Sequence, residues 1–200
     1  MVVKKIESET KLKKVPWKLY LILVLCFTPA ALSYLTYYII KPTTKTNYGF
    51  LINPRDYPVP NLSSDNQLIK SDINDYKGKW LLIHVNNSFC DDLCQKKLYF
   101  MRQLRLTQGK KKDRIERLWL VTDNKKIDEK ILVTYSGTRV IYVDLKKTQN
   151  WLPVEEDANL FDHLFLIDPL GNLMMRFPKN PDPNLIKNDL YRLLKASRIG

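Results

Sequence analysis

The chain has 200 residues, which is enough for one membrane segment and one ordinary domain. Its formal net charge is +12, and its three cysteines exclude a four-cysteine zinc site within one chain.

The first predicted element is a single transmembrane helix at residues 19–40. These 22 residues carry no charge and lie between Lys18 and Lys41. At ~1.5 Å per residue they give ~33 Å of helix, about the thickness of the hydrocarbon layer. Pro29 lies inside the run, and a membrane helix tolerates it. We expect a retained anchor rather than a cleaved signal peptide, because the apolar run continues to Ile40.

The flanking charges predict the orientation of this helix. Residues 1–18 form a basic tail with six lysines and two glutamates, so the positive-inside rule places the tail in the cytoplasm. We therefore expect a single-pass protein of the bacterial inner (plasma) membrane with its domain in the periplasm, and no binding to nucleic acid. In that oxidising compartment two close cysteines form a disulfide, a metal site or a switching pair.

The exported part begins with a predicted linker. Residues 41–60 contain four prolines and are expected to be semi-extended. Residues 61–200 form the predicted domain, and Leu62 to Lys79 are expected to hold a short hairpin and a turn at Lys77-Gly78. The densest basic run of the domain is predicted to be a solvated loop, with a face for anionic headgroups as the alternative; it consists of Lys110, Lys111, Lys112, Arg114 and Arg117.

Hydrophobic patterning predicts alternating strands and helices from Trp80 onward. The predicted strands are Trp80–Val85, Leu118–Val121, Val140–Val143, His163–Ile167 and Leu173–Phe177. The predicted helices are Gln95–Gln108, Ile127–Tyr135, Lys146–Trp151 and Asn184–Ala196. A βαβ unit followed by a β-hairpin and a helix indicates an α/β, thioredoxin-like domain behind the transmembrane helix.

Cys90 and Cys94 lie between the end of the first predicted strand and the start of the helix that follows it. Residues i and i+4 share one helical face, and a helix N-terminus favours the thiolate. Asp91 and Asp92 oppose this, since nearby negative charge raises a thiol pKa. The pair is suited to redox exchange or to a soft metal, although thioredoxin-type oxidoreductases generally have two residues between the cysteines rather than three.

Two thiolates and one imidazole suit copper, and the chain has two histidines. His163 is the better candidate ligand, because it opens a strand after a loop that faces the cysteine helix in a thioredoxin-like fold. Asp162 is expected to orient its imidazole. His84 lies inside an apolar strand, where a structural role is the more natural expectation.

Residues 48–198 resemble the Sco/SenC family of cytochrome c oxidase assembly proteins. The resemblance is carried by Lys77-Gly78-Lys79-Trp80, Cys90-Asp91-Asp92-Leu93-Cys94, Val121-Thr122-Asp123 and the segment from Asp162 to Gly171. It implies copper ligands Cys90, Cys94 and His163, with Asp92 matching the family pattern beside the pair. The family usually has proline after each cysteine, where this chain has Asp91 and Gln95.

The resemblance implies a membrane-anchored copper chaperone that passes copper to the copper-A subunit of cytochrome c oxidase. Its further partners would be periplasmic copper or thiol donors. One alternative is a thiol-disulfide oxidoreductase that uses Cys90 and Cys94 as a catalytic redox pair and acts on the copper-site cysteines of the oxidase. Another is an assembly factor without metal, in which the two cysteines form a fixed disulfide.

Overall fold

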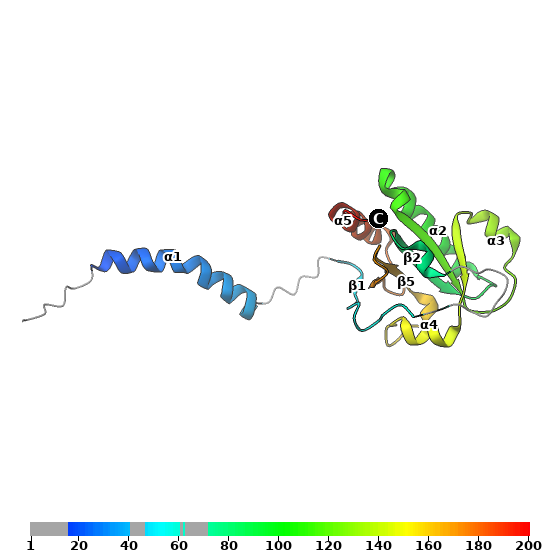
Figure 1. The fold of residues 1–200 in the computed structure, drawn as a ribbon, viewed down its shortest axis with the longest axis horizontal. Coiled ribbons are helices and arrows are strands. Elements are labelled where there is room, and N and C mark those ends of the chain that lie inside the picture. Colours follow the sequence, from blue (N-terminus) through cyan, green and yellow to red (C-terminus); the bar gives the residue numbers. More distant parts are fainter. Residues whose placement is uncertain (1–15, 41–46, 61, 63–71) are drawn as a thin grey trace, which may run out of the picture. The chain divides into compact units, whose positions relative to one another are not determined.

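The computed structural model describes residues 16–40, 47–60, 62 and 72–200. The chain divides into two compact units, residues 1–45 and 46–200 (Figure 1). Most of the predicted basic tail, the start of the predicted linker and residues 63–71 of the predicted hairpin lie outside the described residues.

The N-terminal unit contains one long helix, α1, at Trp17–Leu35, followed by a short π-helix at Thr36–Ile40. Pro29 lies within α1. By length and composition, the 23 residues Trp17–Ile39 are able to cross a membrane. The predicted apolar helix is confirmed, whereas its orientation and the type of membrane stay predictions.

The C-terminal unit is built on one six-stranded sheet with the order β1-β6-β5-β2-β3-β4. Neighbouring strands β2, β3 and β4 are parallel, and the pairs β2–β5, β5–β6 and β1–β6 are antiparallel. The strands are β1 (Phe50–Leu51), β2 (Trp80–Asn86), β3 (Ile115–Val121), β4 (Thr138–Tyr142), β5 (Leu164–Ile167) and β6 (Leu173–Arg176). This is the predicted thioredoxin-like arrangement.

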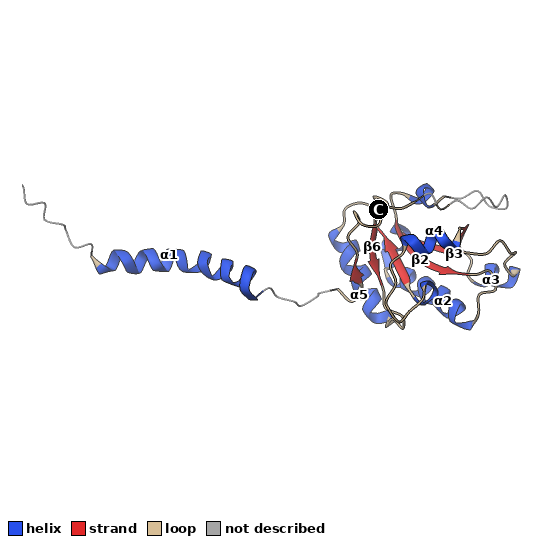
Figure 2. Ribbon diagram, turned by 90° about the horizontal axis from the view of Figure 1, so that it is seen from below, coloured by secondary structure: helices blue, strands red, loops and turns tan. Residues whose placement is uncertain are grey.

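Helices lie on both faces of the sheet (Figure 2). The first face packs its core against α2 and α5, and the second face packs its core beneath α4. Side chains alternate between the two faces along β2. Trp80 and Leu82 therefore lie in the first core, and Leu81 and Ile83 lie in the second. The helices are α2 (Asp92–Thr107), α3 (Glu129–Thr134), α4 (Leu145–Trp151) and α5 (Pro183–Ala196).

Two segments differ from their predicted form. Phe50–Leu51, expected within a linker, pairs with β6 as an edge strand, and Asp189 of α5 accepts hydrogen bonds from the backbone N–H groups of Tyr48 and Gly49. After the undescribed part of the predicted hairpin, Ile73–Tyr76 forms a 3₁₀ helix. The turn predicted at Lys77-Gly78 is confirmed.

The basic run is not one solvated loop. Gly109–Arg114 forms a 3₁₀ helix, and Arg114 donates to the carbonyl of Leu194 at the end of α5. Arg117 lies in β3 with its side chain buried, and it donates to the Ser136 carbonyl. Basic residues with such contacts have structural roles, so the charge of this run is only partly available at the surface.

Candidate functional site

Cys90 and Cys94 form a disulfide at the carboxyl end of β2. Their Cα atoms lie 5.1 Å apart, with Cys90 just ahead of α2 and Cys94 within its first turn. Each cysteine is 1% exposed and belongs to the first core. The predicted convergence of the two sulfurs is confirmed.

The backbone of Cys90 is in an unusual conformation. Its φ of 42° makes it the one non-glycine residue with positive φ in the described part of the chain. Such a conformation costs of order 1–3 kcal/mol. Two side chains hold the segment in place: Asn87 accepts from the Cys90 N–H at 3.3 Å, and Gln95 donates to the Cys90 carbonyl at 3.1 Å.

The residue after each cysteine makes a hydrogen bond that holds the segment around the disulfide. Asp91 is the N-cap of α2, and its carboxylate accepts a hydrogen bond of 2.9 Å from the Cys94 N–H. Gln95 makes the contact to Cys90 just described. Asp92 is exposed in the first turn, where its negative charge complements the helix dipole. Its expected role beside the pair stays a prediction.

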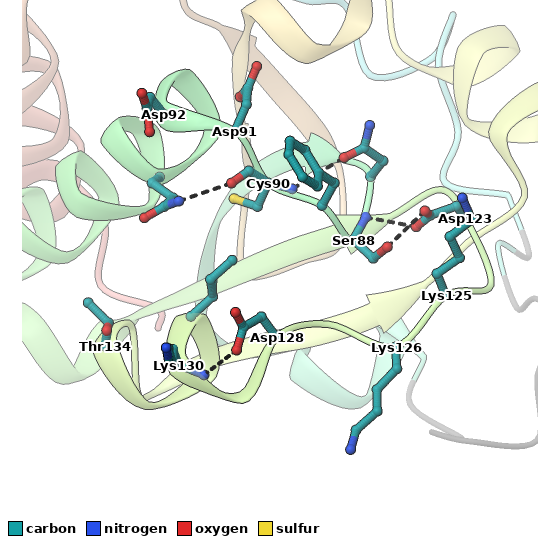
Figure 3. Close-up of a pocket in the computed structure, with 14 residues that line it drawn as sticks. Ser88, Cys90, Asp91, Asp92, Asp123, Lys125, Lys126, Asp128, Lys130 and Thr134 are labelled. Atoms are coloured by element: carbon teal, nitrogen blue, oxygen red, sulfur yellow. Dashed lines mark hydrogen bonds between the residues drawn. The ribbon is translucent and has the colours of Figure 1, made fainter.

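A second acidic residue fastens the loop that leads to Cys90. Asp123, just after β3, accepts from the Ser88 backbone N–H at 2.7 Å and from the Ser88 hydroxyl at 2.8 Å (Figure 3). These bonds join the loops that follow the parallel strands β2 and β3. In the sequence, the position of Asp123 just after a buried strand is the signal for a role at this edge of the sheet.

An open cavity of about 830 Å³ lies beside the disulfide. Its walls come from the Cys90 loop, the start of α2, the loop after β3, and α3 (Figure 3). Cys90 lines this cavity, and the neighbouring Phe89 is 79% exposed. Cys90 of the disulfide thus borders an open cavity, with the exposed apolar side chain of Phe89 also lining it.

His163 lies at the start of β5 and is fully buried. Its Nδ1 is 2.9 Å from the Phe177 carbonyl, and its Nε2 accepts from the Glu155 N–H at 3.5 Å. The carbonyl needs a donor, so the ring is the neutral tautomer with its proton on Nδ1. Burial lowers the pKa of His163, while the bond to Phe177 works in the opposite direction. Neither ring nitrogen has a lone pair free for another partner.

The ring of His163 packs edge-on against Phe165, with 6.0 Å between the ring centroids. Phe165 belongs to the second core, whereas both cysteines belong to the first. The loop before β5 does approach the cysteine helix as expected, since Lys97 of α2 donates to the Phe161 carbonyl at 2.5 Å. The side chain of His163 nevertheless turns to the opposite face of the sheet.

The carboxylate of Asp162 contacts Asn159 and Lys179 rather than the imidazole of His163. It accepts from the Asn159 N–H at 3.1 Å and lies 3.3 Å from the Lys179 ammonium. Its partial burial raises its pKa, but the Asn159 bond and the Lys179 pair outweigh this and lower it. The Phe177 carbonyl orients His163 instead.

Among the described residues, no group of three or more His, Cys, Asp or Glu side chains is arranged to hold a metal ion. The ligand set implied by the family resemblance therefore does not fit the geometry, because His163 uses both ring nitrogens on the far face. Its ligand role stays a prediction that requires movement of β5 or its preceding loop.

Residues 80–197, more than half of the chain, match the family model for the transmembrane-like, thioredoxin-like, C-terminal domain. No curated protein shows significant similarity to the sequence.

Solved structures share the fold. The chain is 17% identical to a thiol:disulfide interchange protein from Bacteroides sp., with a TM-score of 0.50, covering 70% of this chain and 90% of that one. It is 16% identical to a thioredoxin-like superfamily protein, with a TM-score of 0.51 and coverage of 70% and 98%. Copper-bound ScoI of Bradyrhizobium japonicum is 18% identical, with a TM-score of 0.49 and coverage of 67% and 97%. The fold and the family match agree, and the chain belongs to the family of transmembrane-like, thioredoxin-like, C-terminal domains.

Proposed function

We propose that this protein is a membrane-anchored thiol-disulfide exchange protein, with Cys90 and Cys94 as its redox pair. The observation that carries the proposal is the position of the disulfide. It joins the end of β2 to the first turn of α2, and it borders an open cavity through Cys90. The fold-level likeness to thiol:disulfide interchange proteins supports the same function class.

The two cysteines have different roles in this scheme. Cys90 lines the cavity, whereas Cys94 does not border it. In the reduced protein the Cys90 thiolate attacks a substrate disulfide, forming a mixed disulfide and releasing one substrate thiolate. The Cys94 thiolate then attacks the Cys90 sulfur, which restores the internal disulfide and releases the second substrate sulfur. The substrate gains two electrons and the protein loses two, and the reverse sequence oxidises a substrate.

A trapping experiment tests this assignment. The full-length protein in detergent carries Cys26→Ser throughout, because Cys26 is a free and exposed thiol. With Cys94→Ser, the remaining Cys90 is expected to accumulate a mixed disulfide with a disulfide-bearing peptide, seen as a mass increase that a dithiol reverses. Cys90→Ser is the matched control and is expected to form at least about tenfold less adduct. Equal trapping by the two variants would remove the distinct roles, and no trapping by either would remove exchange chemistry.

A second candidate is copper delivery to the copper-A subunit of cytochrome c oxidase. The specific observation in its favour is the spacing of the cysteines: three residues lie between them, and their sulfurs converge at one point. Copper would be cargo here, and the reduced pair would supply two soft sulfur ligands. Transfer of copper from the loaded full-length protein to an isolated copper-A subunit supports this candidate. A reduced protein that binds no copper excludes it.

The proposed setting is the bacterial inner membrane, with residues 1–18 in the cytoplasm and the thioredoxin-like unit in the periplasm. The apolar helix and the basic tail before it support this proposal. Protease protection of the tail in intact spheroplasts tests it; a tail cleaved from outside would reverse the orientation.

A further inference from the structure

The backbone of Cys90 has both of its polar groups already bonded. Its N–H donates to Oδ1 of Asn87 at 3.3 Å, and its carbonyl accepts from Nε2 of Gln95 at 3.1 Å (Figure 3). Asn87 lies in the loop after β2, and Gln95 lies in α2. A peptide that docks beside the Cys90 sulfur therefore finds no free backbone group on Cys90 with which to pair.

Each of these two amide side chains uses only one of its ends to hold Cys90. An N–H needs an acceptor and a carbonyl needs a donor, so the bonds fix which end of each amide is used. The NH2 group of Asn87 and the amide oxygen of Gln95 remain without a partner among the described residues. Both side chains are half-buried, and neither free end belongs to the fully buried polar atoms that lack a partner. Both free ends therefore reach solvent.

Asn87 and Gln95 both line the cavity of about 830 Å³ beside Cys90. A cavity of this volume lies in the range of sites that enclose a drug-sized ligand, so it has room for several peptide groups around a disulfide. A peptide bound there loses water from its own N–H and C=O groups, which then need new partners. The free ends of the two amides supply one donor group and one acceptor, as a peptide main chain requires.

The charged side chains around the cavity do not select one sign of substrate charge. Three lysines and four aspartates line it. Asp91 and Asp128 already accept backbone hydrogen bonds as helix caps, and Asp123 accepts from Ser88. Lys126 pairs with Glu129. The uncharged amides are thus the polar groups of this cavity that match a main chain rather than a charged side chain.

We infer that Asn87 and Gln95 bind the main chain of the substrate beside its disulfide, with Asn87 donating to a carbonyl and Gln95 accepting from an N–H. The substrate class is therefore a disulfide within an extended, accessible peptide segment, bound with little regard to its side-chain charges. The inference rests on the proposed thiol-disulfide exchange and names the substrate of that same site.

The test compares two disulfide probes on the full-length protein in detergent. Cys26→Ser and Cys94→Ser leave Cys90 as the single thiol of the chain. One probe is an uncharged linear peptide whose one cysteine is joined to 2-mercaptoethanol by a disulfide. The other is bis(2-hydroxyethyl) disulfide, which has no peptide groups. The Cys90 thiolate bonds to one probe sulfur, and the other sulfur leaves as a thiolate. Mass spectrometry follows the rate of adduct formation.

Asn87→Asp and Gln95→Lys are the matched variants, because each keeps its bond to Cys90 and loses the end that is free for substrate. We expect the ratio of the peptide rate to the small-disulfide rate to fall about three- to tenfold in each variant. A change in the reactivity of the Cys90 thiol affects both probes, so it cancels in this ratio. The two substitutions also add charges of opposite sign, whereas the lost hydrogen bonds lower the ratio in both.

Two ester peptides identify the group that Gln95 accepts. One lacks the N–H of the cysteine, and the other lacks the N–H of the residue after it. One of them is expected to react about three- to tenfold more slowly than the amide peptide with Gln95 present, and to show no such loss with Gln95→Lys.

A rate ratio that stays within about twofold in both variants would overturn the inference and leave exchange chemistry standing. An ester penalty of equal size with Gln95 and with Gln95→Lys would show that another group accepts this N–H, and would also overturn it. The absence of any adduct with either probe would remove the proposed exchange and this inference together.

Discussion

The two histidines of this protein lie on opposite faces of the same sheet, and both are fully buried. His163, on the second face, uses both ring nitrogens in hydrogen bonds to Phe177 and Glu155. His84, on the face that carries the disulfide, has a partner for neither nitrogen among the described residues. The two buried histidines therefore differ in the hydrogen bonding of their ring nitrogens.

The sequence alone does not show this contrast. A histidine at the start of a strand, after a loop near the cysteines, is the natural candidate ligand. A histidine inside an apolar strand is the natural structural residue. The structure gives both ring nitrogens of the first a hydrogen-bond partner. The second is buried on the face that packs against α2, where the His163 backbone and Lys97 act on its ring.

The largest expected effect is on the pH dependence of stability. The pKa of His84 is about 3 in the folded protein and 6.5 for an ordinary histidine. Between these values the unfolded chain binds the proton and the folded chain does not, so stability falls as pH decreases from about 6.5 toward 3. The loss has an upper limit of about 5 kcal/mol. Urea unfolding at a series of pH values measures it.

His84→Leu separates the contribution of His84 to this pH dependence from the contributions of the carboxylates and of His163. Burial also lowers the pKa of His163. We expect the variant to lose clearly less stability between pH 6.5 and 4 than the unaltered protein. Parallel pH curves for the two proteins would show that His84 titrates normally in the fold, and would contradict its burial without a partner.

The next effect is a difference of sign between two substitutions at pH 7.5. His84→Leu removes an unpartnered polar group and is expected to raise the free energy of unfolding by about 1–3 kcal/mol. His163→Leu leaves the Phe177 carbonyl without its donor and is expected to lower it by about 1–3 kcal/mol. The midpoints of urea unfolding of the two variants and of the unaltered protein measure both changes in stability. Two losses of similar size would mean that both imidazoles are satisfied.

The smallest expected effect concerns the two aspartates beside the disulfide. Asp91→Ala removes the cap bond to the Cys94 N–H and is expected to destabilise the domain by about 1 kcal/mol. Asp92→Ala is the matched control; it keeps that bond and loses only a favourable helix-dipole interaction, for which we expect about 0.5 kcal/mol. Thermal unfolding under identical conditions compares them. A larger loss for Asp92→Ala would contradict the assignment of the cap.

Much of the fold was predictable, because buried strands have strong apolar patterns. Trp80–Val85 was predicted, and β2 runs one residue further, to Asn86. The prediction for β3 began at Leu118, three residues late, because Glu116 and Arg117 interrupt the apolar run while the strand continues through them. Phe50–Leu51 was not predicted, since a two-residue strand among prolines has no periodicity to detect.

The site was predictable only in part. Cys90 and Cys94 could be paired from their spacing at a strand-to-helix junction. The sequence predicts that α2 starts at Gln95, whereas the helix starts at Asp92, because Asp91 caps it and Asp92 lies in its first turn. The hydrogen bonds of His163 and the isolation of His84 depend on residues distant in sequence, such as Phe177 and Trp119. No local pattern reveals them.

We propose that Cys90–Cys94 is a working redox pair rather than a fixed disulfide. The most direct measurement is a redox equilibrium of the full-length Cys26→Ser protein in mixtures of oxidised and reduced dithiothreitol, followed by thiol alkylation and mass determination. We predict a reversible two-electron transition with the same midpoint from either direction, while the domain stays folded. A disulfide that survives every mixture and opens only when the domain unfolds would contradict the claim.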